Sequence, residues 1–369
     1  MISPLKSKKI VLLLSNDITY DQRVFRIAST LEQRGAEVTV LGRLLPHSIS
    51  VHWPNITTKR FSISAQSGPL MYAQLNQKLA SFGRSQPWDI VVSNDFDTLL
   101  AGYRIASKSN AAWVLDAHEH FIEVPELQGR NTKRYIWHAL GLWAAKRLDA
   151  AYTVSDSLSR LLSLTYGIEF LTIENRPIFK DLNLTKDKPI KNILYQGALN
   201  RGRGLDTAIL AMQDLPHCKL QFAGEGDISD ELKALVRRYS LEDRVEFLGR
   251  ISPGALDEVT ASAWLGINLL EGGSLNYYYS LANKFFDYAQ LGIPSLNPNF
   301  PEYQRYIDKY NAGLIMDSIT PYDFKHLVYG LMEDEAKYSG LRNGALRMKE
   351  DCHWASQEDA LCSIYESLV

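Results

Sequence analysis

Residues 10–43 read IVLLLSNDITYDQRVFRIASTLEQRGAEVTVLGR, and this stretch indicates the fold class. Its first residues, Ile10–Leu14, are consecutive β-formers, as expected for a strand buried on both faces. From Asp21 to Gly35 the apolar residues recur at helical spacing, and Gly35 is a typical helix stop. Val38–Leu41 is a second apolar strand. The order strand, helix, strand predicts a parallel βαβ unit.

The same alternation continues along the chain on both sides of a polar stretch, residues 179–188, which we interpret as a linker. Before it, the pattern predicts strands at Asp89–Ser93, Ala112–Leu115 and Ala150–Val154 and helices at Met71–Phe82 and Thr98–Ser107. After it, the pattern predicts strands at Asn192–Gln196, Lys219–Ala223, Val245–Leu248, Leu265–Leu270 and Pro294–Leu296 and helices at Leu205–Met212, Asp230–Tyr239 and Asn283–Leu291.

We therefore predict an α/β protein with two tandem Rossmann-like, doubly wound domains, residues 1–178 and 189–350, facing each other across a cleft. A chain of 369 residues suits two such domains of about 150–200 residues each. Ligands bind at the carboxyl ends of the strands in folds of this kind. We therefore expect the functional residues to follow the strands.

The charge and the cysteine content of the chain argue against some classes of function. The formal net charge is −2, so no basic excess points to nucleic acid as a partner. The cysteines, Cys218, Cys352 and Cys362, form neither a disulfide framework nor a metal-binding spacing, and we interpret them as reduced thiols. The apolar run after Lys9 is too short for a signal peptide and is interpreted as a buried strand. We expect a soluble, cytoplasmic protein.

Glycine-containing turns follow several strands in the second half. They are Gly197–Gly204, Gly224–Gly226 and Gly249-Arg250. Glycines let the backbone approach a ligand, and the N-terminus of a following helix attracts an anion. Arg201 and Arg203 add positive charge to the first turn. The combination indicates a nucleotide phosphate, whereas the spacing matches neither a dehydrogenase fingerprint nor a P-loop.

The stretch SLANKFFDYAQLGIPSL, residues 280–296, holds a short helix with charged side chains near its start. Asn283 suits the N-cap, and Lys284 and Asp287 are three residues apart, so they share one helical face. We interpret Lys284 as a ligand of a diphosphate and the Asp287 carboxylate as an acceptor for a ribose diol. The alternative is a solvated ion pair on a surface helix.

Taken together, these segments resemble the GT-B retaining glycosyltransferases, specifically the GT4-like group (glycosyl transferases group 1) that assembles bacterial surface polysaccharides. The resemblance rests on DQRVFRIASTLEQRGAEVTVLGR, LDAHEHFIEVPEL, YQGALNRGRGLDTAI, FAGEGD, RVEFLGR and SLANKFFDYAQLGIPSL. It implies transfer of a sugar from a nucleotide-diphosphate sugar, of the UDP or GDP type, to a glycan or lipid-linked acceptor. It also implies that a last helix, at about 352–369, crosses back to the first domain and couples hinge closure to binding.

The resemblance implies donor-side roles for residues of the second domain. Arg203 and Lys284 would hold the diphosphate, Asp287 would bind the ribose, and the backbone of Arg250 and Ile251 would border the base. The other donor-side residues it implies are Gly197, Gly204, Gly224, Gly226, Glu271 and Asn283. Two positions depart from the family pattern: Ala198 stands where many members have arginine, and Tyr279 stands where Glu271 would have its glutamate partner.

Polar residues at the strand ends of the first domain form the expected acceptor side. His118 matches the cleft histidine of the family, and we expect it to lie close to the reacting sugar. The other residues expected there are Asn16, Asp17, Asp21, Arg23, Asp95 and Glu119. For each of these, helix capping or turn formation is the alternative role.

The residues suggest how the reaction is catalysed. No convincing pair of carboxylates offers a nucleophile. Arg203, Lys284 and helix N-termini offer instead a cationic site for a departing diphosphate. We expect the diphosphate to leave first and to take the acceptor's proton, with attack from the same face. Asp95-Phe-Asp97 has the letters of a metal-binding D-x-D motif, but we expect no metal and no other cofactor.

Two questions stay open at this point. Residues 131–148, NTKRYIWHALGLWAAKRL, have the composition of an interfacial amphipathic helix, which would give peripheral contact with the inner membrane surface. The same spacing of Ile136, Leu140 and Trp143 suits a buried face. As for function, the alternatives are a non-hydrolysing nucleotide-sugar epimerase and a catalytically silent sugar- or nucleotide-binding regulatory subunit.

Overall fold

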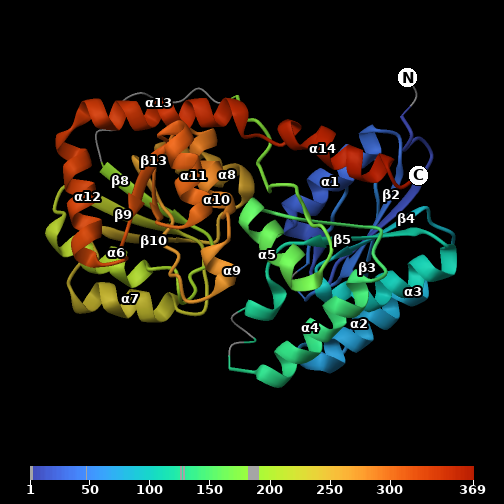
Figure 1. Ribbon diagram of the computed structural model, residues 1–369. Coiled ribbons are helices and arrows are strands. Elements are labelled where there is room, and N and C mark those ends of the chain that lie inside the picture. The colour runs from blue at the N-terminus through green and yellow to red at the C-terminus, as the bar shows by residue number, and fades with distance from the viewer. Residues whose placement is uncertain (1–2, 47, 125–126, 128, 182–190) are drawn as a thin grey trace. The chain divides into compact units, whose positions relative to one another are not determined.

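The computed structural model describes residues 3–46, 48–124, 127, 129–181 and 191–369. The chain divides into two compact units (Figure 1). Unit 1 contains Met1–Asn175 and Gln357–Val369, and unit 2 contains Arg176–Ser356. Most of the predicted linker, residues 182–188, lies outside the described residues. The chain thus passes from one unit to the other twice.

Unit 1 is built on a parallel sheet with the strand order β3-β2-β1-β4-β5-β6-β7. Its strands are β1 (Lys9–Leu13), β2 (Glu37–Arg43), β3 (Thr57–Phe61), β4 (Ile90–Asn94), β5 (Ala112–Ala117), β6 (Ala150–Thr153) and β7 (Leu171–Thr172). Its helices are α1 (Gln22–Gln33), α2 (Gly68–Gly83), α3 (Leu99–Ser109), α4 (Asn131–Ala145), α5 (Asp156–Tyr166) and α14 (Ala355–Glu366), with short 3-10 turns η1 (Ile18–Tyr20), η2 (Phe96–Thr98) and η3 (Phe121–Glu123).

Unit 2 repeats the same winding with the strand order β10-β9-β8-β11-β12-β13. Its strands are β8 (Lys191–Gln196), β9 (Cys218–Ala223), β10 (Val245–Gly249), β11 (Leu265–Ile267), β12 (Ser295–Pro298) and β13 (Gly313–Met316). Its helices are α6 (Leu205–Ala211), α7 (Ser229–Arg238), α8 (Pro253–Ser262), α9 (Leu275–Tyr278), α10 (Asn283–Gln290), α11 (Pro301–Tyr310), α12 (Pro321–Glu333) and α13 (Glu335–Asp351), with a 3-10 turn η5 (Met212–Asp214).

The predicted α/β class with doubly wound parallel sheets is confirmed. All the strand pairs described are parallel. The strands carry fully buried apolar side chains, such as Val11 and Ile193, both 0% exposed. Long apolar strands need cover on both faces, and the alternating helices provide it. Each unit therefore has its own core.

A side chain joins the two central strands of each sheet, where the winding changes direction. In unit 1, Nδ2 of Asn94 at the end of β4 donates to the Leu13 carbonyl of β1. In unit 2, the hydroxyl of Tyr288 on α10 lies 2.9 Å from the Leu194 carbonyl of β8 and 3.2 Å from the Ile267 carbonyl of β11. The crevice outside this point is the usual ligand site of doubly wound sheets.

The structure corrects several predicted boundaries. The N-cap of α10 is Ala282, and Asn283 is the first helical residue, so the prediction of Asn283 as N-cap is wrong. The strand predicted at Leu265–Leu270 ends at Ile267, because the chain leaves the sheet there to form the loop before α9. The side chain of Asp21 caps α1 by accepting from the Val24 amide, 3.0 Å away.

Candidate active site

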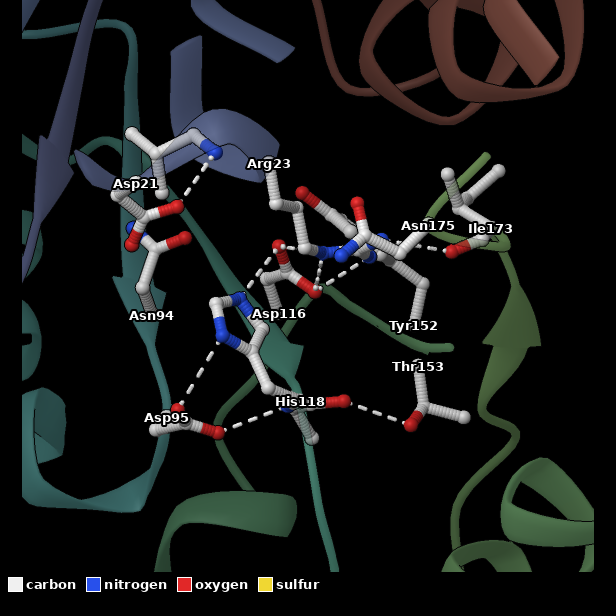
Figure 2. A network of polar contacts seen from close by, with 12 residues as sticks. Asp21, Arg23, Asn94, Asp95, Asp116, His118, Tyr152, Thr153, Ile173 and Asn175 are labelled. Atoms are coloured by element: carbon white, nitrogen blue, oxygen red, sulfur yellow. Dashed lines mark hydrogen bonds and ion pairs between the residues drawn. The ribbon is translucent and has the colours of Figure 1, made fainter. Parts of the chain in front are cut away.

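The carboxyl ends of β4 and β5 place His118 between two carboxylates (Figure 2). Nε2 of His118 lies 3.2 Å from Oδ2 of Asp116, and Nδ1 lies 3.4 Å from Oδ2 of Asp95. The backbone amide of His118 also donates to Oδ1 of Asp95, 2.8 Å away. The ring keeps 25% of its surface exposed. Backbone and side chain of the predicted histidine are therefore both fixed.

Asp116 is held from its other side by Arg23, which lies in the first turn of α1. Nε and Nη2 of Arg23 donate to the Asp116 carboxylate, with Nη2 at 2.8 Å, and Nη1 donates to the Ile173 carbonyl. Burial alone would raise the pKa of Asp116, but the charges of Arg23 and His118 lower it to about 2. Asp116 is therefore a fixed anion in the interior.

These charges also determine the ionisation of His118. Burial disfavours the imidazolium, but the carboxylates of Asp95 and Asp116 outweigh it and raise the pKa of His118 to about 10. Burial raises the pKa of Asp95 as well. An unperturbed imidazole, with a pKa of about 6.5, is mostly neutral at pH 7. With its pKa raised to about 10, His118 is cationic at that pH.

The backbone of Asp95 is strained, with φ 62° and ψ 168°. A residue with a side chain rarely adopts this conformation, and the usual cost is about 1–3 kcal/mol. Here the Asp95 amide donates to the Asp116 carbonyl, and its carboxylate meets both the amide and the ring of His118. The strain thus accompanies the placement of Asp95 beside the histidine.

The other residues predicted for the acceptor side lie near the same strand ends but have separate contacts. Asp17 accepts from Arg60, 3.1 Å away, and from Thr19 and Ser48, and these contacts outweigh burial and lower its pKa. Asn16 is exposed, and its carbonyl accepts from the Arg43 amide. Glu119 is half-buried.

Asp116 and Asp97 were not among the site residues expected from the sequence, although each lies at or just after the end of a strand, where polar residues indicate a site. Asp97 lies in η2, and its Oδ1 is buried without a hydrogen-bond partner. Burial, and next the charge of Asp95, raise the pKa of Asp97 to about 7. The end of β4 therefore carries a carboxyl group that titrates near neutrality.

In unit 2 the predicted glycine turns come together at the ends of β8 and β9. A Cβ on Gly224 would lie 2.0 Å from the Gly197 carbonyl oxygen, and a Cβ on Gly226 would lie 2.4 Å from the Leu199 carbonyl oxygen. Gly197 and Gly224 have positive φ angles of 127° and 150°. Only glycine fits such contacts and angles, so the two turns can pack backbone to backbone.

Lys284 lies beside these turns, where the charge of Asp287 favours its ammonium form but does not outweigh burial. The side chain is 7% exposed, and Nζ has no hydrogen-bond partner. Nζ lies 3.7 Å from the centre of the Tyr195 ring, and a Cβ on Gly197 would be 3.4 Å from it. Burial, and next the positive charge of Arg203, lower the pKa of Lys284 well below its usual value. Such a group is suited to an anionic ligand.

The remaining donor-side residues surround the same turns. Oδ2 of Asp287 accepts from Gln196. Oε1 of Glu271 lies 3.3 Å from the Gly204 amide. Nε of Arg203 is buried without a hydrogen-bond partner. Arg201 differs from our expectation, since it is exposed and pairs with Glu231 at 2.6 Å.

Three other predicted donor-side positions lie at the surface or at the edge of the core. Arg250 and Asn283 are exposed, whereas Ile251 packs at the edge of the core around Tyr288. Both Arg250 and Ile251 lie in the segment that follows β10. This segment approaches the second glycine turn, because a Cβ on Gly249 would lie 3.9 Å from Oε1 of Glu225.

The described residues contain neither a metal-ligand cluster nor a membrane-spanning helix. No group of histidine, cysteine, aspartate or glutamate side chains is arranged to hold a metal ion in the ranges given above. Within those same ranges, none of the helices has the length and apolar character needed to cross a membrane.

Comparison with protein families matches both halves of the chain. Residues 175–348 match the model described as glycosyl transferases group 1, and residues 21–174 match glycosyltransferase family 4. The chain belongs to the GT4-like family of GT-B glycosyltransferases. The resemblance drawn from the sequence is thereby confirmed.

Solved structures with the same fold cover nearly all of this glycosyltransferase. Sucrose-phosphate synthase from Thermosynechococcus elongatus is 18% identical, with a TM-score of 0.78 over 98% of this chain and 99% of that one. HepE from Anabaena in complex with UDP-glucose is 14% identical, with a TM-score of 0.76 over 97% and 99%. WaaG, a glycosyltransferase involved in lipopolysaccharide biosynthesis, is 14% identical, with a TM-score of 0.71 over 96% and 99%. The search of curated proteins gave no match.

Proposed function

We propose that this glycosyltransferase moves a sugar from a nucleoside-diphosphate donor to a hydroxyl of a glycan or lipid-linked acceptor, with retention of the anomeric configuration. The observation that carries the proposal is the buried ammonium of Lys284, which lacks a hydrogen-bond partner beside the glycine turns. A buried charge without a partner costs stability, so a bound anion is the natural counterpart.

On the donor side, Lys284 and Arg203 bind the diphosphate, and Asp287 accepts from the ribose hydroxyls. Glu271 lies with the Gly204 amide near the donor sugar. The segment of Arg250 and Ile251 borders the base. HepE, a structural neighbour, is described in complex with UDP and with UDP-glucose, which favours a uridine diphosphate donor for this chain.

On the acceptor side, we assign the strand ends of unit 1, with His118 as the residue nearest the reaction. WaaG, which shares the fold, is described as acting in lipopolysaccharide biosynthesis. This favours a role in bacterial surface polysaccharide assembly on the cytoplasmic side of the membrane.

In the proposed reaction, the bond between the anomeric carbon and the diphosphate oxygen breaks, and its electron pair leaves with the diphosphate. The acceptor hydroxyl attacks the same face, and its proton passes to a diphosphate oxygen. Lys284 and Arg203 stabilise the charge that develops on the leaving group, which is often the largest catalytic contribution. No metal takes part, so activity should be unchanged by EDTA.

Nucleotide binding is tested by thermal shift with UDP, GDP, ADP, dTDP and CMP. A ligand of the folded state raises the melting temperature according to its concentration relative to Kd. We expect UDP to stabilise the protein, and Arg203→Ala or Lys284→Met to weaken this effect at least tenfold in Kd. Lys337→Met, at an exposed site on α13, is the control and should leave Kd unchanged. Equal shifts in all variants would contradict the assignment.

The stereochemistry is tested by NMR of the product formed from an α-linked donor. An α-linked product would support retention, and a β-linked product would overturn it. Donor turnover to an epimerised sugar without acceptor would favour the epimerase alternative, and a protein that binds UDP but never turns over would favour the silent subunit.

A further inference from the structure

Both ring nitrogens of His118 point at carboxylates, as Figure 2 shows. Nε2 lies 3.2 Å from Asp116 and Nδ1 lies 3.4 Å from Asp95. A neutral imidazole has one N–H donor and one lone pair. With carboxylates on both sides, a neutral ring would turn its lone pair toward an anionic oxygen. Only the imidazolium, with two N–H donors, satisfies both contacts.

The carboxylates that face the ring are themselves fixed. Asp116 is fully buried and accepts hydrogen bonds from Nε and Nη2 of Arg23. The third donor group of Arg23, Nη1, bonds the Ile173 carbonyl, and the whole side chain is 3% exposed. Each of the three nitrogens of Arg23 therefore already has a hydrogen-bond partner, and the side chain is buried. In this structure Arg23 supports Asp116, and the direct acceptor contact expected from the sequence stays a prediction.

Asp95 is fixed by its backbone. Its amide donates to the Asp116 carbonyl, which ties the two carboxylate-bearing residues together. Its strained conformation directs one carboxylate oxygen to the amide of His118 and the other toward the ring. A side chain held this way cannot turn to follow a substrate without releasing the histidine.

We propose that His118 acts as a fixed cation and not as a general base, and that Arg23, Asp95 and Asp116 are the positioning residues that hold it. This inference rests on the proposed function, because it concerns the acceptor side of the transfer reaction. An imidazolium has no lone pair to accept the acceptor's proton. The proton must then go elsewhere, which agrees with its transfer to the departing diphosphate.

Several charged groups surround the His118 ring and affect the pH at which it titrates. Asp95 follows β4, Asp97 lies in η2, Asp116 is on β5 and Arg23 is on α1. The carboxylates favour the imidazolium, and Arg23 opposes it. The raised pKa of His118 agrees with the geometry.

The direct test is NMR of the full chain labelled with ¹⁵N-histidine, with His118→Gln to assign the signal. We expect His118 to keep the imidazolium pattern up to at least pH 8, and its titration midpoint to fall by one pH unit or more in Asp95→Asn. A wild-type midpoint near 6.5, or an unchanged midpoint in Asp95→Asn, would overturn the proposal. A proton located on Asp95, with a neutral ring, would overturn it too.

Asp116→Asn is a second variant that should lower the midpoint, but it leaves Arg23 buried beside a neutral partner and can fail to fold. Asp95→Asn avoids that problem because the Asp95 side chain is 22% exposed. In Asp95→Asn, kcat should fall at least tenfold, and the Kd for UDP should be unchanged. UDP binding is measured separately. If the wild type does not bind UDP, the proposed function is contradicted, but the NMR result on the ionisation of His118 is unaffected.

Discussion

Lys284 and Arg23 are both buried basic side chains, but their surroundings differ. Arg23 bonds a carboxylate and a backbone carbonyl, which compensate the loss of water. Nζ of Lys284 has no hydrogen-bond partner and faces the Tyr195 ring; that cation–π contact and the charge of Asp287 offset a smaller part of the loss. The two side chains therefore have opposite effects on the stability of the unliganded fold.

Replacing Lys284 by methionine should stabilise the unliganded protein, because it removes an unpaired buried charge and keeps the volume. We expect a gain of about 1–2 kcal/mol in the free energy of unfolding, together with the loss of UDP affinity described above. Urea denaturation at pH 7 measures the gain, with Lys337→Met as the control. A loss of stability would mean that the ammonium has a structural partner in the fold.

His118 should make the stability depend on pH. Its pKa is raised to about 10 in the folded state, above an ordinary value of about 6.5 in the unfolded chain. Its contribution is therefore complete below pH 6.5 and is lost as the pH rises toward 10. We expect wild-type stability to fall by about 1–3 kcal/mol from pH 6 to pH 9 relative to His118→Gln, as measured by urea denaturation at each pH. Parallel pH profiles would contradict this.

At the same scale, His118, Lys284 and Arg203 could be proposed from the sequence, because polar residues at strand ends and after glycine turns are recognisable there and because His118 matches the cleft histidine of the family. The sequence did not identify the pairing of Arg23 with Asp116. That contact depends on the register that sets Asn94 opposite Asp116, and on the rotamer by which Arg23 turns inward from α1. Neither property can be derived from spacing alone.

Among the structural elements, the glycine turns of unit 2 allow little change. A methyl group on Gly224 would overlap the Gly197 carbonyl, and the φ angle of 150° is unfavourable for alanine. Gly224→Ala should therefore cost about 2–4 kcal/mol and weaken UDP binding. Gly330→Ala on α12 is the matched control, because a Cβ there meets nothing within 4 Å and alanine favours helix. Thermal denaturation of both variants measures the difference.

Helix α4 has one packed side and one exposed side. Trp137, Leu140 and Trp143 pack against the unit 1 core, whereas Tyr135 and Ile136 are 72% and 58% exposed. Of the three residues whose spacing also suited a buried face, Leu140 and Trp143 pack against the core and Ile136 does not. Peripheral membrane contact of α4 stays a prediction.

If α4 binds membranes, exchanging its exposed apolar residues should weaken that binding. We expect Tyr135→Ser with Ile136→Ser to reduce co-sedimentation with vesicles containing anionic lipid at least fivefold, because apolar burial and basic residues act together at a lipid surface. Tyr322→Ser, at an exposed position of α12, should change nothing. Equal binding of all three proteins would exclude α4 as the contact.

The sequence predicted most strands in the interiors of the sheets and the helices beside them, since apolar runs and helical spacing are strong signals. It did not predict β3, whose residues Thr57–Phe61 are mostly polar, because an edge strand needs little apolar surface. It also did not predict α11, α12 and α13. The last helix was expected at about 352–369 and runs from Ala355 to Glu366.

At the scale of the whole molecule, the proposed function assigns the donor to unit 2 and the acceptor to unit 1. Hydrogen exchange with and without UDP tests this division. We expect protection in residues 197–204, 224–226 and 284–287, where backbone and cations would meet the diphosphate, and little change in residues 93–120. Protection centred on unit 1 would place the nucleotide elsewhere. The Lys284→Met variant, which should lose the protection, is the control.

The path of the chain has a consequence for its synthesis. Unit 2 is continuous in sequence, but unit 1 includes Gln357–Val369, where the hydroxyl of Tyr365 meets that of Tyr152 at 2.9 Å. A ribosome makes the first half early, yet the segment that completes its packing emerges only after all of unit 2. The growing polypeptide therefore carries an unfinished amino-terminal half until residues 357–369 have been made. Termination before Gln357 would leave that half exposed to chaperones and proteases.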